Sequence, residues 1–461
     1  MTTSTTSIAT QTTTTSAPAN ITVPNVPASL IQALYPSTPE TLNAYSYSGL
    51  PHPAIVQEFE AAFPNIHIAM AANEDPSGLL SGLATHTYIY DNFRILWTLM
   101  PQEIATGEVM NIAPWIDQYL PFLETQIAPA AWNSVANGQS SVATAGANGH
   151  AYCIPEDWAP VALMYREDIF NKYGLTVPTT WAQYAADAAK LHSENSSITM
   201  TVFPPNEIGG DLMGFFWQAG GNFIVPTGNN AYDVEINSTI NMNVMNYWGN
   251  LINSGEVQAI NMWTPQYNNE LASSEIASLA TAAAWYPGYA VEPIAPNEAG
   301  LWRVSDMPQW NSTTFVTGGI ASSCFGVTAN AKYPGASFIY SYYVTENPTV
   351  MPYMWQQSGQ WSANSYWLQN LKYSNGTSVF FKNDTYFGGE NIGTVYLKSQ
   401  EHMGTQWVMS PFQITMQTIL QEQLTEAAAK QITFTQLMQN LETIMISYIQ
   451  NSGATISGVG H

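Results

Sequence analysis

Residues 148–191 read NGHAYCIPEDWAPVALMYREDIFNKYGLTVPTTWAQYAADAAKL. Within this stretch, residues 152–155 and 161–165 are short runs rich in apolar and aromatic side chains, which predict two strands. Residues 181–191 place apolar side chains at helical spacing, which predicts a helix. Strands that alternate with helices over such short distances are typical of an α/β fold.

The same alternation opens the folded part of the chain, which we expect to begin near Thr41. Residues 42–49 form a strand pattern that ends in glycine, residues 53–63 have helical spacing, and residues 66–70 alternate like a strand. The order strand, helix, strand implies a parallel sheet with a crossover connection. Residues 411–450 are largely helical in pattern, and the chain shows no internal repeat at solenoid periods.

The charge balance excludes two classes of partner. Only 9% of the residues are charged, against about 25% in an ordinary soluble domain. There are 33 acidic and 10 basic residues, which gives a net charge of −23. Nucleic acids and anionic membrane surfaces are bound through many Lys and Arg side chains, so neither is expected as a partner. Carboxylates that repel one another at neutral pH lose this repulsion when they are protonated in acid. The sparse, acidic charge pattern therefore favours a protein that faces an acidic medium, as in an acidophilic archaeon. An acidic protein of neutral habitat is the alternative.

The N-terminal segment differs from the rest of the chain. Residues 2–18 are almost entirely Thr and Ser, and such a segment cannot bury enough apolar area to fold. We interpret residues 1–40 as a disordered, O-glycosylated stalk, with a membrane anchor that is absent from this sequence. The sequence contains no run of about 20 apolar residues, which is the length that a membrane-spanning helix needs. Sequons for N-glycosylation, expected in an exported glycoprotein, occur at Asn20, Asn195, Asn237, Asn311, Asn375 and Asn383.

The quoted stretch carries a resemblance to a known family. Its punctuating residues resemble the signature region of extracellular solute-binding proteins of the maltose-binding type, which serve ABC importers. The residues that match are Gly149, Tyr152, Pro155, Tyr165, Asp168, Phe170, Gly174, Pro178, Thr180 and Trp181. Arg166 stands where the family usually has Asn. Further matching stretches lie at residues 44–68, 281–289, 315–343 and 358–364, so the resemblance covers nearly everything after the stalk.

The resemblance implies a two-lobed α/β fold of the periplasmic-binding-protein type (type II), with hinge strands joining the lobes and the ligand cleft between them. By analogy, lobe one is residues 41–153 plus 306–345, and lobe two is residues 156–303 plus 348–461. A cleft between lobes is a common place for a ligand. Cys153 and Cys324 both fall near strands that approach the hinge in the resembling fold, so we predict a disulfide between them.

The resemblance also implies candidate ligand-binding residues, each with a structural alternative. Aromatic rings stack on the apolar faces of sugars, and polar side chains bind the hydroxyl groups. The aromatic candidates, each of which could instead pack in a core, are Trp285, Tyr286, Trp158, Trp97, Trp217, Trp361, Trp407 and Tyr47. The polar candidates are Asp157, Asp91, Ser48 and Glu74, and Asp91 could instead cap a strand. Gly318 and Gly319 could present backbone amides to a ligand or form a bulge.

These observations favour an extracellular, cell-surface binding protein that captures a mono- or disaccharide for the permease subunits of an ABC importer. We expect a monomer that is not an enzyme and needs no cofactor or metal, since there is no Cys/His cluster. A secreted glycoside hydrolase remains an alternative, although no motif identifies a catalytic carboxylate pair. Binding of a peptide or polyamine and a role as a surface-layer or interaction protein also stay open.

Overall fold

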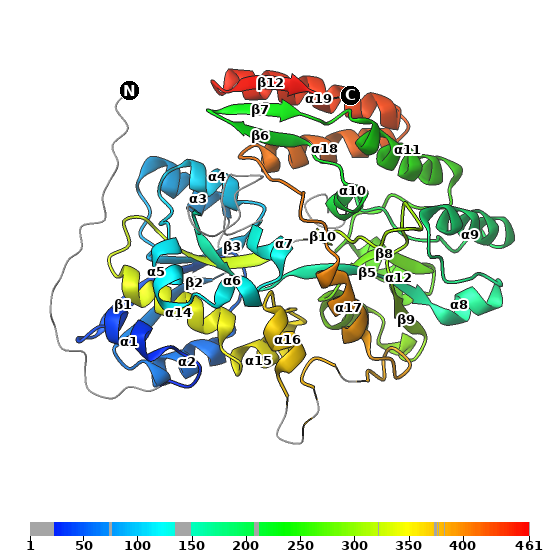
Figure 1. The fold of residues 1–461 in the computed structure, drawn as a ribbon. Coiled ribbons are helices and arrows are strands. Elements are labelled where there is room, and N and C mark those ends of the chain that lie inside the picture. Colours follow the sequence, from blue (N-terminus) through cyan, green and yellow to red (C-terminus); the bar gives the residue numbers. More distant parts are fainter. Residues whose placement is uncertain are drawn as a thin grey trace.

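The computed structural model describes residues 23–72, 76–133, 149–206, 212–320, 322–372, 376, 378–381 and 383–460. These residues form two α/β lobes, each built on its own sheet, and a smaller third sheet at one end of the second lobe (Figure 1). The expected two-lobed α/β fold is therefore confirmed.

The first lobe contains a five-stranded sheet in the order β2-β1-β3-β11-β4. Its strands are β1 (Glu40–Ser46), β2 (Ile66–Ala72), β3 (Asn92–Leu96), β4 (Cys153–Pro155) and β11 (Ser323–Val327). Strand β1 is parallel to β2 and β3, whereas β11 is antiparallel to β3 and β4. The predicted parallel strand–helix–strand unit at the start of the fold is confirmed by β1, α2 and β2.

Helices surround this first sheet. They are α1 (Ala28–Leu34), α2 (Pro53–Ala62), α3 (Pro76–Thr85), α4 (Met100–Ala105), α5 (Ala113–Tyr119), α6 (Leu123–Gln126), α7 (Pro129–Ala131), α14 (Pro334–Glu346), α15 (Val350–Ser358) and α16 (Ser365–Asn370). Helix α14 is buried over most of its length because it contacts the sheet on one side and α1, α2 and α15 on others. An apolar helix without a polar face is expected to lie inside a fold in this way.

The second lobe is built on a sheet in the order β10-β5-β8, with β9 also paired to β5. Its elements are β5 (Ala159–Arg166), β8 (Ser278–Ala283), β9 (Trp302–Ser305), β10 (Gly319–Ile320), α8 (Glu167–Lys172), α9 (Trp181–Glu194), α10 (Met213–Ala219), α11 (Thr239–Ser254), α12 (Pro265–Ala272), η3 (Pro287–Val291), α13 (Glu292–Ile294), η4 (Pro296–Glu298) and α17 (Ile392–Glu401). Helix α9 begins where predicted, because Thr180 and Gln183 form a reciprocal capping box at its first turn.

Arg166, which departs from the family pattern, has a structural role in this lobe. The side chain is buried, and it forms an ion pair with the buried carboxylate of Glu298. It also donates from Nε to Oδ1 of Asp168 at 2.9 Å. A buried guanidinium needs such partners to offset its loss of solvation. Arg166 therefore connects β5 to η4 and α8.

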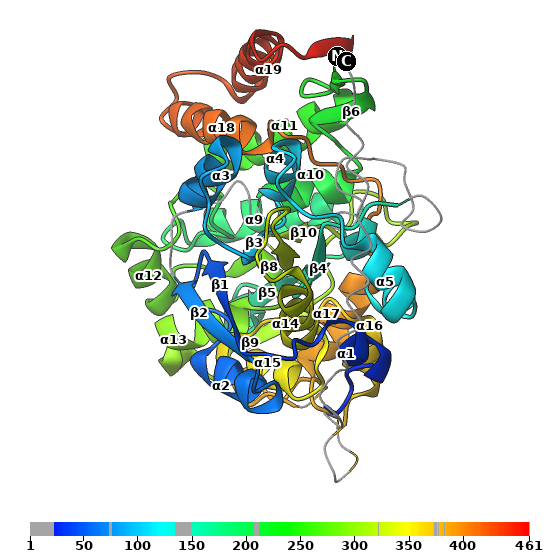
Figure 2. The same cartoon turned by 90° about the vertical axis from the view of Figure 1, so that its left-hand side faces the viewer.

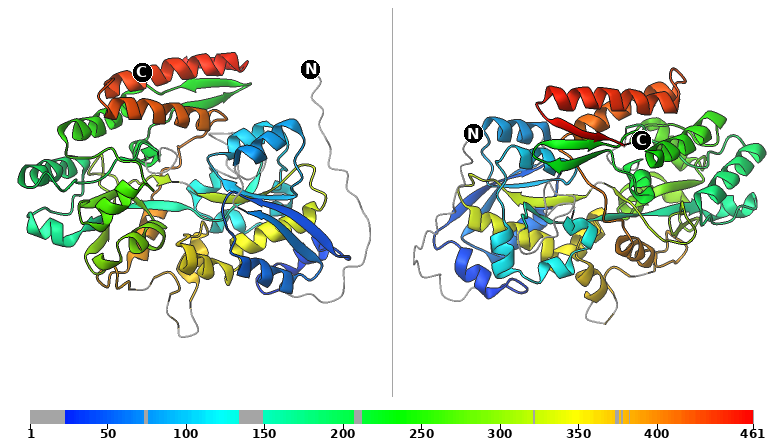
Figure 3. Two further views of the ribbon diagram at one scale, coloured as in Figure 1. Left: turned by 180° about the vertical axis from the view of Figure 1, so that it is seen from behind. Right: turned by 45° about the horizontal axis from the view of Figure 1, so that its top comes forward.

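A third unit closes the chain. Strands β12 (Thr455–Val459), β7 (Ala231–Val234) and β6 (Ile224–Gly228) form a small sheet, and α18 (Gln413–Ala428) lies against α19 (Phe434–Asn451). Helix α19 also contacts α11 and β12, which attaches the unit to the second lobe. Figure 2 and Figure 3 show this unit at the same end of the molecule from other sides. The helices predicted in residues 411–450 are confirmed.

The lobe boundaries differ from the prediction at two places. Residues 306–320 lie with the second lobe, because β10 pairs with β5 and the ring of Trp310 lies 5.6 Å from that of Trp181. Helix α15 contacts α14 of the first lobe as well as η3 of the second, and α16 contacts α6 of the first lobe. The boundaries between the two lobes depend on hydrogen bonding and ring packing, and neither can be read from the pattern of residues.

Cys153 and Cys324 form a disulfide in the structure, with their Cα atoms 5.7 Å apart. The bond joins β4 to β11, which are paired neighbours in the first sheet. Both strands continue into the second lobe, β4 through residues 156–158 and β11 through its connection to β10. The disulfide therefore fixes the first lobe at the point where two connections leave it. In the described part of the chain, no helix is long and apolar enough to cross a membrane.

Candidate functional site

A pocket of about 280 Å³ lies between the two lobes. The first lobe contributes residues from the ends of β1 and β3 and the start of β11, and the second contributes residues that follow β8. The pocket is lined by Tyr47, Ser48, Leu50, Arg94, Leu96, Asp157, Trp285, Tyr289, Ser323, Ser358 and Gln360. The ends of β1 and β3 are carboxyl ends of parallel strands, where ligands of α/β proteins commonly bind. Another pocket, of about 320 Å³, is lined only by residues of the second lobe.

Arg94 forms the polar floor of the pocket between the lobes. The guanidinium is 1% exposed and donates from Nε to Oε2 of Glu156 at 2.6 Å. It also donates from Nη1 to Oγ of Ser48 at 2.8 Å and from Nη2 to Oγ of Ser323 at 3.1 Å. The ring of Tyr47 lies over the guanidinium, with its centroid 4.9 Å from Cζ. This network holds each polar group of the floor in a fixed orientation.

Asp157 lies beside this network on the segment that links β4 to β5. Its Oδ1 atom accepts a hydrogen bond of 2.6 Å from the backbone N–H of Ser323. Burial and the adjacent Glu156 carboxylate raise the pKa of Asp157 to about 7, against the opposing effect of Arg94. As the pH falls below about 7, Asp157 therefore takes up a proton, while the ionised Glu156 balances the charge of Arg94 until the pH reaches the raised pKa of Glu156. The floor then offers hydrogen bonds without a net charge.

Aromatic rings form the opposite wall. Trp285 follows β8 directly and is partly exposed, and Tyr289 lies in the π-helical turn η3 with 60% of its surface exposed. Their ring centroids are 5.9 Å apart. Gly359, in the loop after α15, packs against the backbone of Trp285: it has a φ of 66°, and a Cβ atom there would lie 3.0 Å from the Trp285 carbonyl oxygen. Glycine therefore lets this loop close one end of the aromatic wall.

Four of the predicted ligand-binding residues meet in this pocket. They are Tyr47 and Ser48 after β1, Asp157 on the crossing segment, and Trp285 after β8. The side-chain chemistry that the pocket brings together is an aromatic face opposite several hydroxyl, carboxyl and amide groups. Such a surface can bind a solute that has both an apolar face and many hydroxyl groups.

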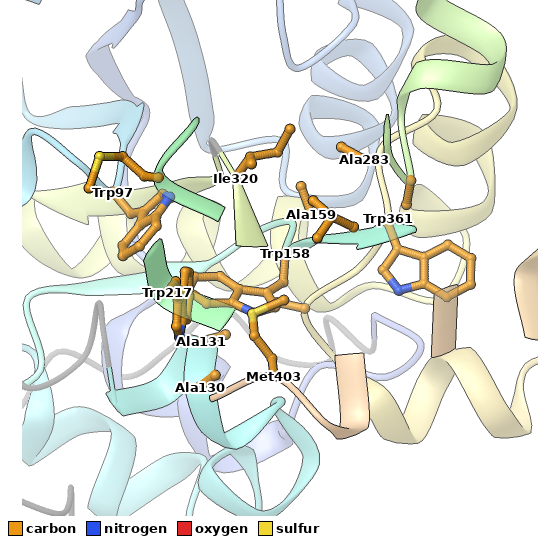
Figure 4. Close-up of a cluster of buried hydrophobic side chains, with 14 of the residues drawn as sticks. Trp97, Ala130, Ala131, Trp158, Ala159, Trp217, Ala283, Ile320, Trp361 and Met403 are labelled. Carbon is orange, nitrogen blue, oxygen red and sulfur yellow. The ribbon is translucent and has the colours of Figure 1, made fainter. Parts of the chain in front are cut away.

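Five predicted tryptophans do not reach the pocket. Trp97, Trp158 and Trp217 form a buried cluster, and Trp361 is buried near α17 (Figure 4). The ring of Trp407 joins this cluster by stacking on Trp217. Within the cluster, Nε1 of Trp158 donates to Sδ of Met403, and Nε1 of Trp217 donates to the carbonyl oxygen of Gly404.

Each of these five rings is covered by protein in this structure, and ligand contact by them remains a prediction. The cluster of Trp97, Trp158, Trp217 and Trp407 instead joins the end of β3 in the first lobe to α10 in the second, with Trp97 and Trp217 centroids 5.6 Å apart.

Four further predicted residues also lie outside the pocket lining. Tyr286 is buried, and its hydroxyl lies 3.3 Å from Sδ of Met262. Asp91 accepts hydrogen bonds from backbone N–H groups of Asn43 and Lys332, at 3.0 and 2.6 Å, and so holds β1 and the loop before α14. Gly318 and Gly319 are buried against α10, where Cβ atoms would meet Gly214, Trp217 and Met403. The close approach at these glycines is to protein.

Other predicted positions stay untested. Glu74, Asn20 and Asn375 lie outside the described residues. Among the remaining sequons, Asn311 and Asn383 are exposed, which suits glycosylation. The side-chain amides of Asn195 and Asn237 already donate to the Tyr173 hydroxyl and to Oε1 of Glu442, at 2.9 and 2.8 Å. Glycosylation of any of these residues remains a prediction.

Part of the lining was not predicted from the sequence, namely Leu50, Arg94, Leu96, Tyr289, Ser323, Ser358 and Gln360. Arg94 could have been found, because it is one of only 10 basic residues and stands between Phe93 and Ile95 in the strand NFRIL. A cation at such a position must be paired or functional. Tyr289 follows Trp285 by four residues, which is a spacing that places two side chains on one face of a helical turn. Ser323, Ser358 and Gln360 give no such signal.

The architecture is that of a two-lobed binding protein with its site between the lobes, and the family comparison agrees. Residues 53–339 match the family model of the bacterial extracellular solute-binding proteins. The chain belongs to this family. A search of curated protein sequences found no match.

Solved structures show the same fold at low sequence identity. The galacto-N-biose/lacto-N-biose I-binding protein of the ABC transporter from Bifidobacterium longum, in complex with lacto-N-biose, matches with a TM-score of 0.74 and 16% identity, over 92% of this chain and 100% of that chain. The ABC transporter associated binding protein from B. animalis subsp. lactis Bl-04, in complex with β-1,6-galactobiose, gives a TM-score of 0.71 and 20% identity over the same shares. The sugar-binding protein MalE from Xanthomonas citri gives 0.71 and 14%, over 90% and 98%.

Proposed function

We propose that this protein captures a neutral mono- or disaccharide outside the cell and delivers it to the permease subunits of an ABC importer. One observation carries the proposal: the pocket between the lobes sets Trp285 and Tyr289 opposite the hydrogen-bonding floor around Arg94 and Asp157. A pyranose has the matching surfaces, because its C–H faces are apolar and its edge carries hydroxyl groups. The pocket volume of about 280 Å³ lies near the lower end of ligand sites in general, which favours a small solute.

The charge state of the floor supports a neutral ligand. Glu156 is paired with Arg94, and Asp157 is protonated below pH 7. A polyamine site needs several ionised carboxylates around its aromatic rings, whereas the described lining of this pocket has Asp157 as its one carboxyl group. An anionic solute would meet an Arg94 whose charge is already balanced. A neutral sugar avoids both difficulties.

The same lining argues against a glycoside hydrolase. Hydrolysis of a glycosidic bond needs an acid and a second carboxylate on either side of the bond, about 5–10 Å apart. Glu156, the nearest other acid, has one oxygen bound to Arg94 and lies beneath the floor. A single accessible carboxyl group suits binding better than cleavage.

The relatives support delivery to a transporter. Two of the similar structures are binding proteins of ABC transporters in complex with disaccharides, and a third is a sugar-binding protein. The protein would act as an extracellular monomer held at the cell surface. The low charge density is compatible with work in acid.

A thermal-shift screen at pH 3–5 tests the proposal. The panel contains neutral mono- and disaccharides, uronic acids, spermidine and short peptides. A ligand present at 100 times its dissociation constant adds about 2.7 kcal/mol of stability, which raises the melting temperature measurably. We expect a shift with a neutral sugar and none with the charged solutes. A shift only with spermidine or peptides, or release of monosaccharide from a disaccharide on incubation, would contradict the proposal.

A further inference from the structure

Trp263 has an unusual backbone conformation and an unusual exposure. Its φ is 65°, in the left-handed region that bulky residues rarely adopt. The sequence has fifteen tryptophans, all within the described residues, and Trp263 is the one with the largest exposed fraction, at 41%. A strained backbone persists only where the surrounding structure imposes it, and such residues concentrate at functional sites.

The neighbours of Trp263 impose this conformation. The side chain of Asn206 bonds both backbone groups of the preceding residue: Oδ1 accepts from N–H of Met262 at 2.9 Å, and Nδ2 donates to its carbonyl oxygen at 3.1 Å. On the other side, Oγ1 of Thr264 caps α12 by accepting from N–H of Tyr267 at 3.3 Å. Trp263 is thus held between two fixed points, with its ring directed outward.

The ring of Trp263 extends the aromatic wall of the pocket. Its centroid lies 6.2 Å from that of Trp285, with 23° between the planes, and 5.9 Å from that of Tyr289. The two rings are therefore nearly parallel neighbours, and 41% of the Trp263 surface remains exposed beside them. Trp285 and Tyr289 line the pocket, whereas Trp263 lies just beyond it.

We propose that Trp263 binds a second sugar unit outside the pocket, so that the protein selects a disaccharide or longer ligand over a monosaccharide. The inference rests on the proposed function and adds the size of the ligand. The first unit occupies the pocket between Arg94 and Trp285, and the next unit packs its C–H face on the exposed ring of Trp263. A ring that only stabilised the fold would gain more from burial than from exposure in a strained position.

The test compares ligands of different length in matched variants. Trp263→Gly removes the ring and relieves the strain, because glycine adopts positive φ freely. Trp263→Tyr keeps a stacking ring. Tyr366→Ala is the control, since Tyr366 is another exposed aromatic residue, on α16 and outside the pocket lining. Isothermal titration calorimetry measures glucose and galactose against maltose, cellobiose, lactose, β-1,6-galactobiose and maltotriose, together with the melting temperature of each variant.

We expect the wild type to bind a disaccharide or trisaccharide more tightly than either monosaccharide. Trp263→Gly should weaken binding of the longer ligand about tenfold and change monosaccharide binding less than about twofold, with an unchanged or higher melting temperature. Trp263→Tyr should restore most of the affinity, and Tyr366→Ala should bind as the wild type does. Equal effects on short and long ligands, no effect, or preference for a monosaccharide would overturn the inference and leave the proposed function standing. Binding of no sugar at all would overturn both.

Discussion

The Nε atom of Arg94 lies 2.6 Å from the Oε2 atom of Glu156, and both side chains are buried where β3 faces the segment that crosses between the lobes. The pair therefore belongs to the pocket and to the hinge at once. Burial raises the pKa of Glu156, although Arg94 opposes the shift. Removing the cation would leave a buried carboxylate without its partner, which is far more costly than the pair itself is stabilising.

We predict that Arg94→Met lowers the free energy of unfolding by about 3–5 kcal/mol at pH 7. The loss should shrink toward pH 3, because Glu156 without Arg94 takes up a proton more readily and is then no longer a buried charge. Urea unfolding at both pH values measures this. Lys398→Met is the control: Lys398 pairs with Asp306, and the two side chains are 46% and 42% exposed, so its loss should cost less than about 1 kcal/mol. A loss for Arg94→Met that is the same at both pH values would contradict this account of the pair.

Stability should also fall as the pH rises, because of Glu346. This carboxyl group is buried at the end of α14, accepts a hydrogen bond from Nδ2 of Asn364, and has its pKa raised by burial to about 8. The native state therefore holds this proton between pH 4.5 and 8, whereas the unfolded chain releases it. Where the native state binds more protons, stability decreases with increasing pH.

We predict that the melting temperature of the wild type is higher at pH 4 than at pH 8, and that Glu346→Gln narrows this difference by raising stability at pH 8. Glutamine keeps an acceptor for Asn364 and carries no charge. Glu422→Gln, at an exposed position on α18, should leave the difference as it is. Differential scanning calorimetry at the two pH values decides. A Glu346→Gln variant with the pH profile of the wild type would show that Glu346 is not the group responsible.

The buried tryptophan cluster should affect stability more than affinity. Trp217 is covered on the sides that face Trp97, Trp158 and Trp407. Trp217→Ala should therefore cost about 3–5 kcal/mol of unfolding free energy, as expected for a large aromatic side chain in a core. Sugar affinity, measured at a temperature where the variant remains folded, should change less than about threefold. A Trp217→Ala variant that is as stable as the wild type but no longer binds sugar would contradict this prediction and show that Trp217 contacts the ligand.

Much of the fold was predictable from the sequence, since residues 40–72 and 153–194 place their apolar residues with clear periods of two or about 3.6. The pocket was predictable only in part. Tyr47, Ser48, Asp157 and Trp285 follow strands whose ends could be located. The rings of Trp158 and Trp217 could not be placed, because a tryptophan beside a binding site and a tryptophan beneath it have the same local sequence. The distinction depends on which lobe covers the ring.

Two members of the site escaped prediction for different physical reasons. Trp263 reaches the wall through a backbone conformation that no side-chain pattern reports. Gln360 enters from a loop that becomes part of the pocket only because Gly359 approaches the backbone of Trp285. Contacts between residues far apart in the chain decide both positions.

The disulfide between Cys153 and Cys324 can be tested by counting free thiols and by measuring the stability of the reduced protein. Protein unfolded without reductant should show no free thiol, and reduced protein should be less stable by about 2–5 kcal/mol, because the bond closes a loop over a sequence separation of 171. Ellman titration and urea unfolding measure the two quantities. Two free thiols in the unreduced protein would contradict the bond between Cys153 and Cys324.

The most direct test of a sugar site between the lobes is isothermal titration calorimetry at pH 4 with the sugar that gives the largest thermal shift, on the wild type and on Trp285→Ala. Loss of a stacking ring from the pocket wall should weaken binding at least about tenfold. The account predicts saturable binding of one sugar per chain to the wild type and a dissociation constant at least about tenfold higher for Trp285→Ala. Absence of saturable binding for any neutral sugar, or equal affinity of the two proteins, would contradict it.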